Sequence, residues 1–209
     1  MSAPRGTETA AERGRILASV THLVGENGYA ATSLSEVLDR AGVGEEEFRR
    51  HFEDLRSAFL VAWQAASDRY MEAALVAFQG ETGWRSQIRA VARSIFEFVL
   101  RDPHQGRILF AEGCDPEQPV RKQIDDPNAV AFVALIDAGR QQMPDPEMLT
   151  KATAEGIFGA VKEQVARALE EKDLARLPAL YPQLMSMVVR PYLGDQAARE
   201  ELLLGPPHA

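Results

Sequence analysis

Apolar side chains recur along this chain at the three- and four-residue spacing of amphipathic helices, and no period-two run is long enough to predict a sheet. Residues 1–9 are polar, and we expect them to form a disordered arm. The first helix is predicted from about Thr9 to Asn27, where the Asn27-Gly28 pair favours an end. Further helices are predicted over about 34–41, 44–52, 55–79, 84–101, 147–172, 178–193 and 195–204. Between them, a short helix is predicted around 108–110, and another, kinked or restarted at Pro127, is predicted to end at about 142. The fold class is therefore expected to be all-α, with about nine to ten helices.

Residues 32–52 have the pattern of a helix-turn-helix, two short helices joined by a glycine-containing turn. In the first of these helices, apolar residues at i, i+3, i+4 and i+7 predict one buried face. Ser33 and Glu36 have the spacing of a capping box at its start. Gly42 is suited to the left-handed conformation that ends a helix. Local signals therefore predict both ends of the first helix.

The second helix of this motif begins with three glutamates and carries two arginines on its outer side. Gly44 is a tolerable N-cap, and the glutamates Glu45–Glu47 occupy the first turn, where the helix dipole favours negative charge. Phe48 and Phe52 are expected to face inward. The outer surface is then left to glutamates and arginines.

In the second half of the chain, Gly and Pro residues predict a loop over 113–119, around the single Cys114. The helix that follows is expected to bury Val130, Val133 and Ile136, with Phe132 as a further inward candidate. The helix over 147–172 has an unusually small face, which suits a close helix–helix contact.

Composition limits the kinds of protein this chain can be. One cysteine excludes a disulfide framework and fits a reducing cytoplasm, where we expect the protein to be located. Residues 1–12 carry no apolar segment, so no signal peptide is predicted, and no run approaches the ~20 apolar residues of a membrane span. The histidines are scattered and no catalytic, phosphate-binding or metal-ligand motif is present, so we predict no enzyme, no metal and no cofactor.

Charge is unfavourable for binding nucleic acid. Residues 1–60 contain seven arginines, no lysine and ten carboxylates, which gives a formal charge of −3 within a chain of net charge −8. Phosphate neutralisation usually supplies most of the non-specific affinity for DNA. Distribution matters more than the sum, however, because Arg13, Arg15, Arg49 and Arg50 can converge on one surface.

The residues Ala41-Gly42-Val43-Gly44, Phe48 and His51-Phe52, followed by a long helix from Leu55, resemble the N-terminal unit of the TetR family of bacterial transcriptional regulators. Gly28-Tyr29 before Thr32-Ser33 fits the same resemblance. It is specific over residues 13–63 and rests mainly on helix count beyond residue 64.

The resemblance implies a helix-turn-helix DNA-binding domain over residues 1–54 and a helical ligand-binding and dimerisation domain over residues 55–209. It further implies a homodimer that binds double-stranded DNA at a palindromic operator, most simply as a repressor released by a small molecule. The effector is expected to be apolar or amphipathic. The alternative is a helical dimer that binds proteins or small molecules and has weak or lost DNA binding.

This chain departs from the family pattern at its contact positions. Family members usually carry Ser or Thr where Gly44 stands and Tyr where Arg49 stands, and a nearby Lys is absent here. Arginine can bind phosphate or read guanine, and Glu45 or Glu46 could accept from cytosine. An unusual operator is therefore expected.

Three sets of candidate site residues follow. The candidate DNA contacts are Arg15, Thr32, Ser33, Gly44, Glu45, Glu46, Arg49, Arg50 and His51. Capping explains Ser33 equally well, packing explains His51, and pairing with Glu45, Glu46 or Glu53 is the alternative for Arg49 and Arg50. For Glu45–Glu47, stabilisation of the helix start is the first interpretation, and base reading or poor DNA binding is the alternative. The candidate ligand-binding residues are Phe96, Phe110, Phe132 and Phe158, with Glu112 and Arg107 as polar handles; ordinary core packing is the alternative for the aromatics. The candidate dimer-interface residues are Gly156, Ala160, Gln164, Leu184, Met185 and Val188.

Overall fold

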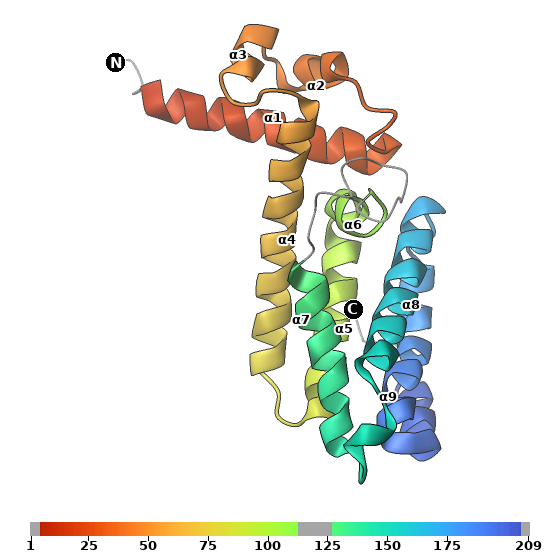
Figure 1. The fold of residues 1–209 in the computed structure, drawn as a ribbon. Coiled ribbons are helices and arrows are strands. Elements are labelled where there is room, and N and C mark those ends of the chain that lie inside the picture. Colours follow the sequence, from red (N-terminus) through yellow and green to blue (C-terminus); the bar gives the residue numbers. More distant parts are fainter. Residues whose placement is uncertain (1–4, 113–126, 206–209) are drawn as a thin grey trace.

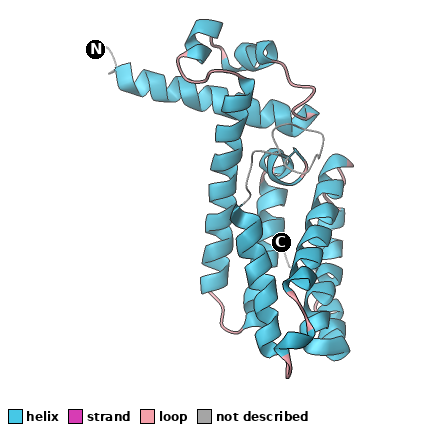
Figure 2. Ribbon diagram, in the orientation of Figure 1, coloured by secondary structure: helices cyan, strands magenta, loops and turns pink. Residues whose placement is uncertain are grey.

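The computed structural model describes residues 5–112 and 127–205, and within them the chain consists of helices and short loops without strands (Figure 2). The predicted loop around Cys114 lies outside these residues. The all-α prediction is confirmed. The helices are α1 (Arg5–Asn27), α2 (Leu34–Ala41), α3 (Glu45–Arg49), α4 (Leu55–Gln79), α5 (Trp84–Arg101), α6 (Pro103–Phe110), α7 (Pro127–Asp137), α8 (Lys151–Glu170) and α9 (Arg176–Leu203), with short 3-10 turns η3 (Ala138–Gln142) and η4 (Pro146–Met148).

Helices α1 to α3, which we call the head, lie at one end of a longer bundle formed by α4 to α9, which we call the body (Figure 1). Helix α1 crosses the end of α4, and α2 and α3 lie on the side of α1 that faces away from the body (Figure 1). Helix α4 packs against α1 and also against α5 and α6. It therefore belongs to both parts, as its 25-residue length suggests.

Several helix boundaries differ from the predicted ones. Helix α1 begins at Arg5, inside the arm that we expected to be disordered. Helix α8 begins at Lys151, because Pro146 starts a separate 3-10 turn. Helix α9 is interrupted at Gly194, whose φ of 79° is not helical, so the short helix expected over 195–204 continues it after a kink.

The core runs through both parts of the molecule. In the head, Ile16, Val37, Phe48 and Phe52 are at most 5% exposed, as the helix-turn-helix pattern predicted for the last three. In the body, the inward prediction for Val130 is wrong, since this side chain is 64% exposed. The inward predictions for Val133, Ile136 and Phe132 are confirmed, since each is 6% exposed, and these three make the buried face of α7. Within residues 5–112 and 127–205, no helix combines the length and apolar character needed to cross a membrane.

Candidate functional site

The helix-turn-helix is held by the local bonds that its sequence predicts. The backbone N–H of Glu36 donates to Ser33 Oγ over 3.3 Å, and the Ser33 N–H donates to Glu36 Oε2 over 2.8 Å. Hydrogen bonds from the Ser33 hydroxyl and backbone lower the pKa of Glu36. Gly42 ends α2 with a φ of 63°, in the left-handed region. Both ends of α2 are thus fixed by its own residues.

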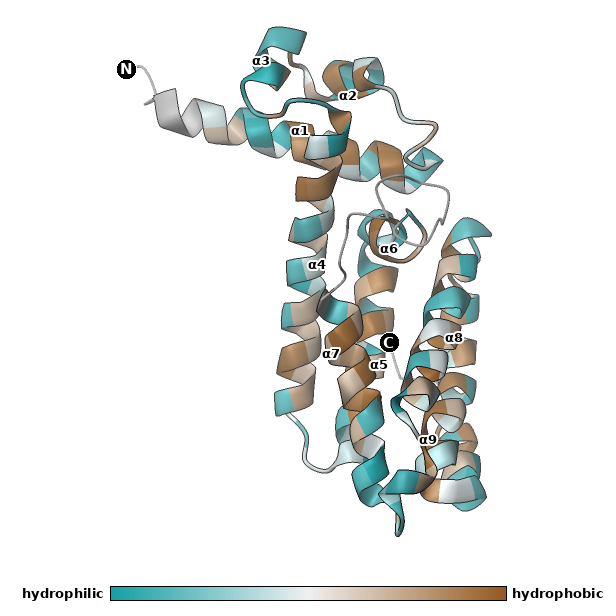
Figure 3. Ribbon diagram, in the orientation of Figure 1, coloured by the Kyte–Doolittle hydropathy of each residue, from teal (hydrophilic) through white to brown (hydrophobic). Residues whose placement is uncertain are grey.

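Helix α3 has a charged outer surface on which the two signs are already paired. Figure 3 shows this helix as mostly hydrophilic. Arg49 donates to Glu45 Oε1 from Nε and Nη2, over 3.0 and 2.7 Å. Arg50 Nη2 lies 3.7 Å from Glu47 Oε1 and 3.9 Å from Glu12 Oε2. Both arginines are exposed, so a phosphate can reach them, but it must compete with carboxylates.

Glu47 also acts at the start of α3. Its Oε2 accepts a hydrogen bond of 2.6 Å from the backbone N–H of Gly44, which has no side chain with which to cap the helix. This is the stabilisation of the helix start that the sequence predicts for the glutamates. Glu45 and Glu46 remain on the exposed surface.

Three further candidate DNA contacts are engaged inside the head. The Thr32 hydroxyl donates to the Gly28 carbonyl over 2.8 Å and Thr32 is 8% exposed. Arg15 Nε donates to the Ala41 carbonyl over 3.1 Å, at the end of α2. His51, whose side chain is 5% exposed, lies with Nε2 3.2 Å from Glu12 Oε2 on α1. Thr32 thus fixes the loop between α1 and α2, and Arg15 and His51 each join α1 to another part of the head. A role of these residues in DNA contact stays a prediction.

A small apolar cavity of about 60 Å³ lies inside the body. Three of the four predicted aromatics, Phe110, Phe132 and Phe158, line it. Phe96 does not, because it packs edge-to-face on Tyr181 with ring centroids 5.7 Å apart. The other lining residues are Tyr70, Ile88, Val91, Ala92, Ile95, Leu135, Ile136, Val161, Lys162, Met185 and Val188.

Most of these lining residues were not among the candidates predicted from the sequence. They lie on the same apolar stripes as ordinary core residues, so periodicity does not separate them from the core. Lys162 offers the one distinguishing signal, a charged side chain beside the apolar stripe of α8.

The two predicted polar handles lie at the junction between head and body, away from the cavity lining. Glu112 Oε2 accepts a hydrogen bond of 2.8 Å from the backbone N–H of Tyr29. Its Oε1 accepts one of 3.2 Å from Arg107 Nε. Gly28, with a φ of 88°, packs so closely that a Cβ there would lie 3.2 Å from Glu112 Oε1. Glu112 therefore joins the body to the end of α1.

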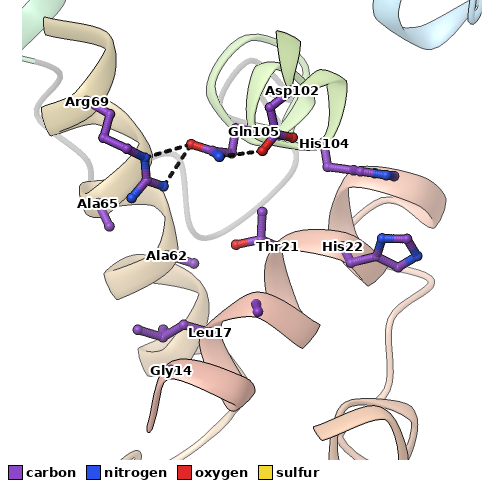
Figure 4. A pocket seen from close by; sticks show the side chains of 11 residues that line it. Gly14, Leu17, Thr21, His22, Ala62, Ala65, Arg69, Asp102, His104 and Gln105 are labelled. Carbon is purple, nitrogen blue, oxygen red and sulfur yellow. Dashed lines mark hydrogen bonds between the residues drawn. The ribbon is translucent and has the colours of Figure 1, made fainter. Parts of the chain in front are cut away.

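Beside this junction, an open groove of about 630 Å³ lies between α1, α4 and α6 (Figure 4). Arg69 of α4 donates twice to Gln105 Oε1, over 2.9 and 2.7 Å, and Gln105 in turn donates to Asp102 (Figure 4). The rings of His22 on α1 and His104 on α6 lie 4.5 Å apart. Head and body thus meet through packed side chains.

The candidate dimer residues fall into two groups. Gly156 and Ala160 are exposed on α8, and Gln164 is half-buried. Leu184, Met185 and Val188 are at most 8% exposed and pack inside the body. Met185 and Val188 line the cavity, so within one chain these α9 side chains face inward.

No family model matches the chain. A curated relative, the HTH-type transcriptional activator FasR from Mycolicibacterium smegmatis, is 28% identical over 126 residues, which cover 60% of this chain and 56% of that protein. The match thus spans about half the length of the relative.

Solved structures match over nearly the whole chain. FadR from Bacillus halodurans, a fatty acid degradation regulator, gives a TM-score of 0.74 at 15% identity and covers 90% of this chain and 96% of that one. FadR from Bacillus subtilis in complex with stearoyl-CoA gives 0.72 at 16% identity over 86% and 97%. A TetR-family regulator from Streptomyces coelicolor gives 0.70 at 20% identity over 88% and 96%.

The described part of the chain thus combines a helix-turn-helix head with a helical body that holds an apolar cavity. More particularly, the chain has the TetR-type fold that these structures share. The resemblance predicted from the sequence is confirmed at the level of the fold.

Proposed function

We propose that this chain is a TetR-family transcriptional regulator that binds DNA as a homodimer and responds to a small molecule. The observation that carries the proposal is the helix-turn-helix, with an exposed α3 bearing Arg49 and Arg50, on a body with an internal apolar cavity. In such a motif the second helix enters the major groove, and a dimer presents two of them to a palindromic site.

The direction that we propose is repression, with ligand binding favouring a conformation of low DNA affinity. The curated relative is named as an activator, so activation is the alternative outcome. The FadR structure from Bacillus subtilis contains stearoyl-CoA, an amphipathic molecule, and the lining of the cavity here supports an apolar or amphipathic effector. A cytoplasmic location follows from this role.

The proposed dimer would use the exposed small residues of α8. Gly156→Arg should give a monomer in sedimentation experiments, because a long charged side chain prevents close helix approach. Leu184→Ala should instead destabilise the single chain, since Leu184 is 8% exposed within it. A Gly156→Arg protein that stays dimeric would place the interface elsewhere.

Selection of bound DNA from a random library is the test of DNA binding. We expect enrichment of a palindrome and a clear fall in affinity with salt. Arg49→Ala and Arg50→Ala should each lower the salt slope by about 0.9, the value for one phosphate contact. Arg167→Ala is the matched control, because Arg167 is an exposed arginine of α8 that also pairs with a glutamate, Glu163, at 3.1 Å.

The pairing of Arg49 with Glu45 favours one alternative, a helical ligand-binding dimer with weak or lost DNA binding. The variant Glu45→Gln distinguishes this alternative from a head that binds DNA. On a DNA-binding head it should strengthen binding to unselected DNA, because Arg49 is released and one repelled charge is removed. If the library yields no enriched sequence and Glu45→Gln gains no affinity at low salt, the alternative holds.

A further inference from the structure

An open groove of about 330 Å³ lies between α4 and α7, and we call it the α4–α7 groove. Three of its lining residues, Val91, Phe132 and Leu135, also line the internal cavity of about 60 Å³. The groove and the cavity therefore share a wall of side chains. The other lining residues of the groove are Met71, Ala74, Leu75, Phe78, Ala131 and Ala138.

The two helices that flank this groove are not closely packed on each other. Among the described residues, α4 packs mainly on α5, and α7 packs mainly on α8. Tyr70 of α4 and Phe132 of α7 meet on the cavity side, with ring centroids 5.1 Å apart. A ligand in the groove can therefore move α4 and α7 apart without breaking a closely packed helix interface.

The α4–α7 groove has no charge with which to bind an ion. Within the part of the chain that the structure describes, no ionisable side chain lines it. A charged group buried there would lose its hydration without gaining a partner of opposite sign. An uncharged apolar group would instead gain by leaving water, and it would cover Leu75, which is 52% exposed. The lining therefore favours an uncharged ligand.

The size of the groove fits a small molecule better than the cavity does. Its volume of about 330 Å³ falls within the roughly 300–1,000 Å³ of ordinary ligand sites, whereas the cavity of about 60 Å³ does not. Phe78 of α4 and Phe132 of α7 place aromatic rings along it, and such rings pack well against other aromatic rings. A ligand with aromatic rings would thus have partners on both flanking helices.

We propose that the α4–α7 groove binds an uncharged aromatic molecule, which presses on the wall that the groove shares with the cavity. The inference rests on the proposed function, since this molecule would be the effector of the regulator. Helix α4 also packs on α1 of the head, so a ligand against α4 would act on the helix that joins the two parts. Direct ligand binding tests this site and DNA selection tests the regulator, so the failure of either proposal is distinguishable from the failure of the other.

Fluorescence titration with N-phenyl-1-naphthylamine tests the proposal, and 8-anilino-1-naphthalenesulfonate is its charged counterpart. The two probes share one ring system and differ by a sulfonate group. We expect the uncharged probe to bind at least tenfold more tightly, because the sulfonate would be desolvated without a cation. Leu75→Arg and Ala131→Arg, each on one side of the groove, should each weaken binding of the uncharged probe at least tenfold. Each should also reduce the preference for the uncharged probe, since the new cation attracts the sulfonate.

Val76→Arg and Val130→Arg are the matched controls. Val76 and Val130 are the chain neighbours of Leu75 and Ala131, are 66% and 64% exposed, and do not line the groove. Both controls should leave the affinity for N-phenyl-1-naphthylamine unchanged, and circular dichroism would verify that all four variants are folded. Equal binding of the two probes, no binding of the uncharged probe, or equal effects of Leu75→Arg and Val76→Arg would overturn the proposal.

Discussion

The contact between α1 and α6 gives the sharpest prediction, because one glycine permits it. A Cβ built on Gly25 would lie 2.5 Å from both Cα and Cβ of His104. Carbon atoms pack best at about 3.5–4.0 Å, so Gly25→Ala must push the two helices apart by roughly 1 Å. A backbone atom cannot rotate away as a side chain can, and the strain therefore falls on the junction between head and body.

Its magnitude follows from two opposing effects. Overpacking of this kind typically costs about 1–3 kcal/mol, and replacing a helical glycine by alanine returns at most about 1 kcal/mol. We expect a net loss of about 1–2 kcal/mol for Gly25→Ala. Gly14 is the matched control on the same helix, since a Cβ there meets no atom within 4 Å. Gly14→Ala should stabilise the protein by up to about 1 kcal/mol.

Urea unfolding at one fixed protein concentration measures both variants, because an oligomer would make stability depend on concentration. The two should differ by about 1–3 kcal/mol, or roughly 2–12 °C in melting temperature for a chain of this size. If Gly25→Ala is as stable as Gly14→Ala, α1 and α6 do not approach as closely as described, and the packed junction is refuted.

Three other predictions concern stability. Glu201, 2% exposed, accepts from Arg85 and Arg89. Glu201→Gln should therefore cost about 2–3 kcal/mol, below the ~3–5 kcal/mol of a fully buried pair because both arginines are partly exposed. Glu200→Gln, at the exposed end of the same network, should change the unfolding midpoint little. Burial raises the pKa of Tyr181 and Tyr192 from 10.0 to about 12. The free energy of unfolding should therefore be unaffected below pH 10 and fall between pH 10 and 12, because the unfolded chain loses these protons first. Phenolate absorbance would follow the titration of the two side chains. Thr32→Val, which removes a buried hydrogen bond, should lower the unfolding free energy by about 1 kcal/mol.

The sequence was most informative where neighbouring residues decide the structure. The capping box at Ser33, the left-handed Gly42 and the inward Phe48 each depend on residues within a few positions, and all three are present in the structure. Contacts across the fold could not be foreseen in the same way. Glu12 on α1 approaches Arg50 and His51 only because the head folds back on itself, and no local pattern connects positions 39 residues apart.

The candidate ligand site shows the same division. Aromatic residues were a useful guide, because large side chains surround most internal spaces, and Phe110, Phe132 and Phe158 do line the cavity. Glu112 does not line this cavity, and a carboxylate on a helix end can serve either a ligand or another helix. Here it bonds the backbone of Tyr29. Lys162 was overlooked because a charged residue on a long helix is normally read as solvated surface.

Helix α6 is the element that the cavity and the head have in common. Phe110, at its last position, lines the cavity, whereas His104 near its start packs against Gly25 of α1. A ligand that widens the cavity must displace Phe110, and a shift of this eight-residue helix also changes its contact with α1. A displacement at the Phe110 end of α6 is therefore expected to change the contact of His104 with α1. On the proposed function, a ligand changes DNA affinity only if it binds two positions of this helix with different free energies, and a change at Gly25 perturbs the same helix.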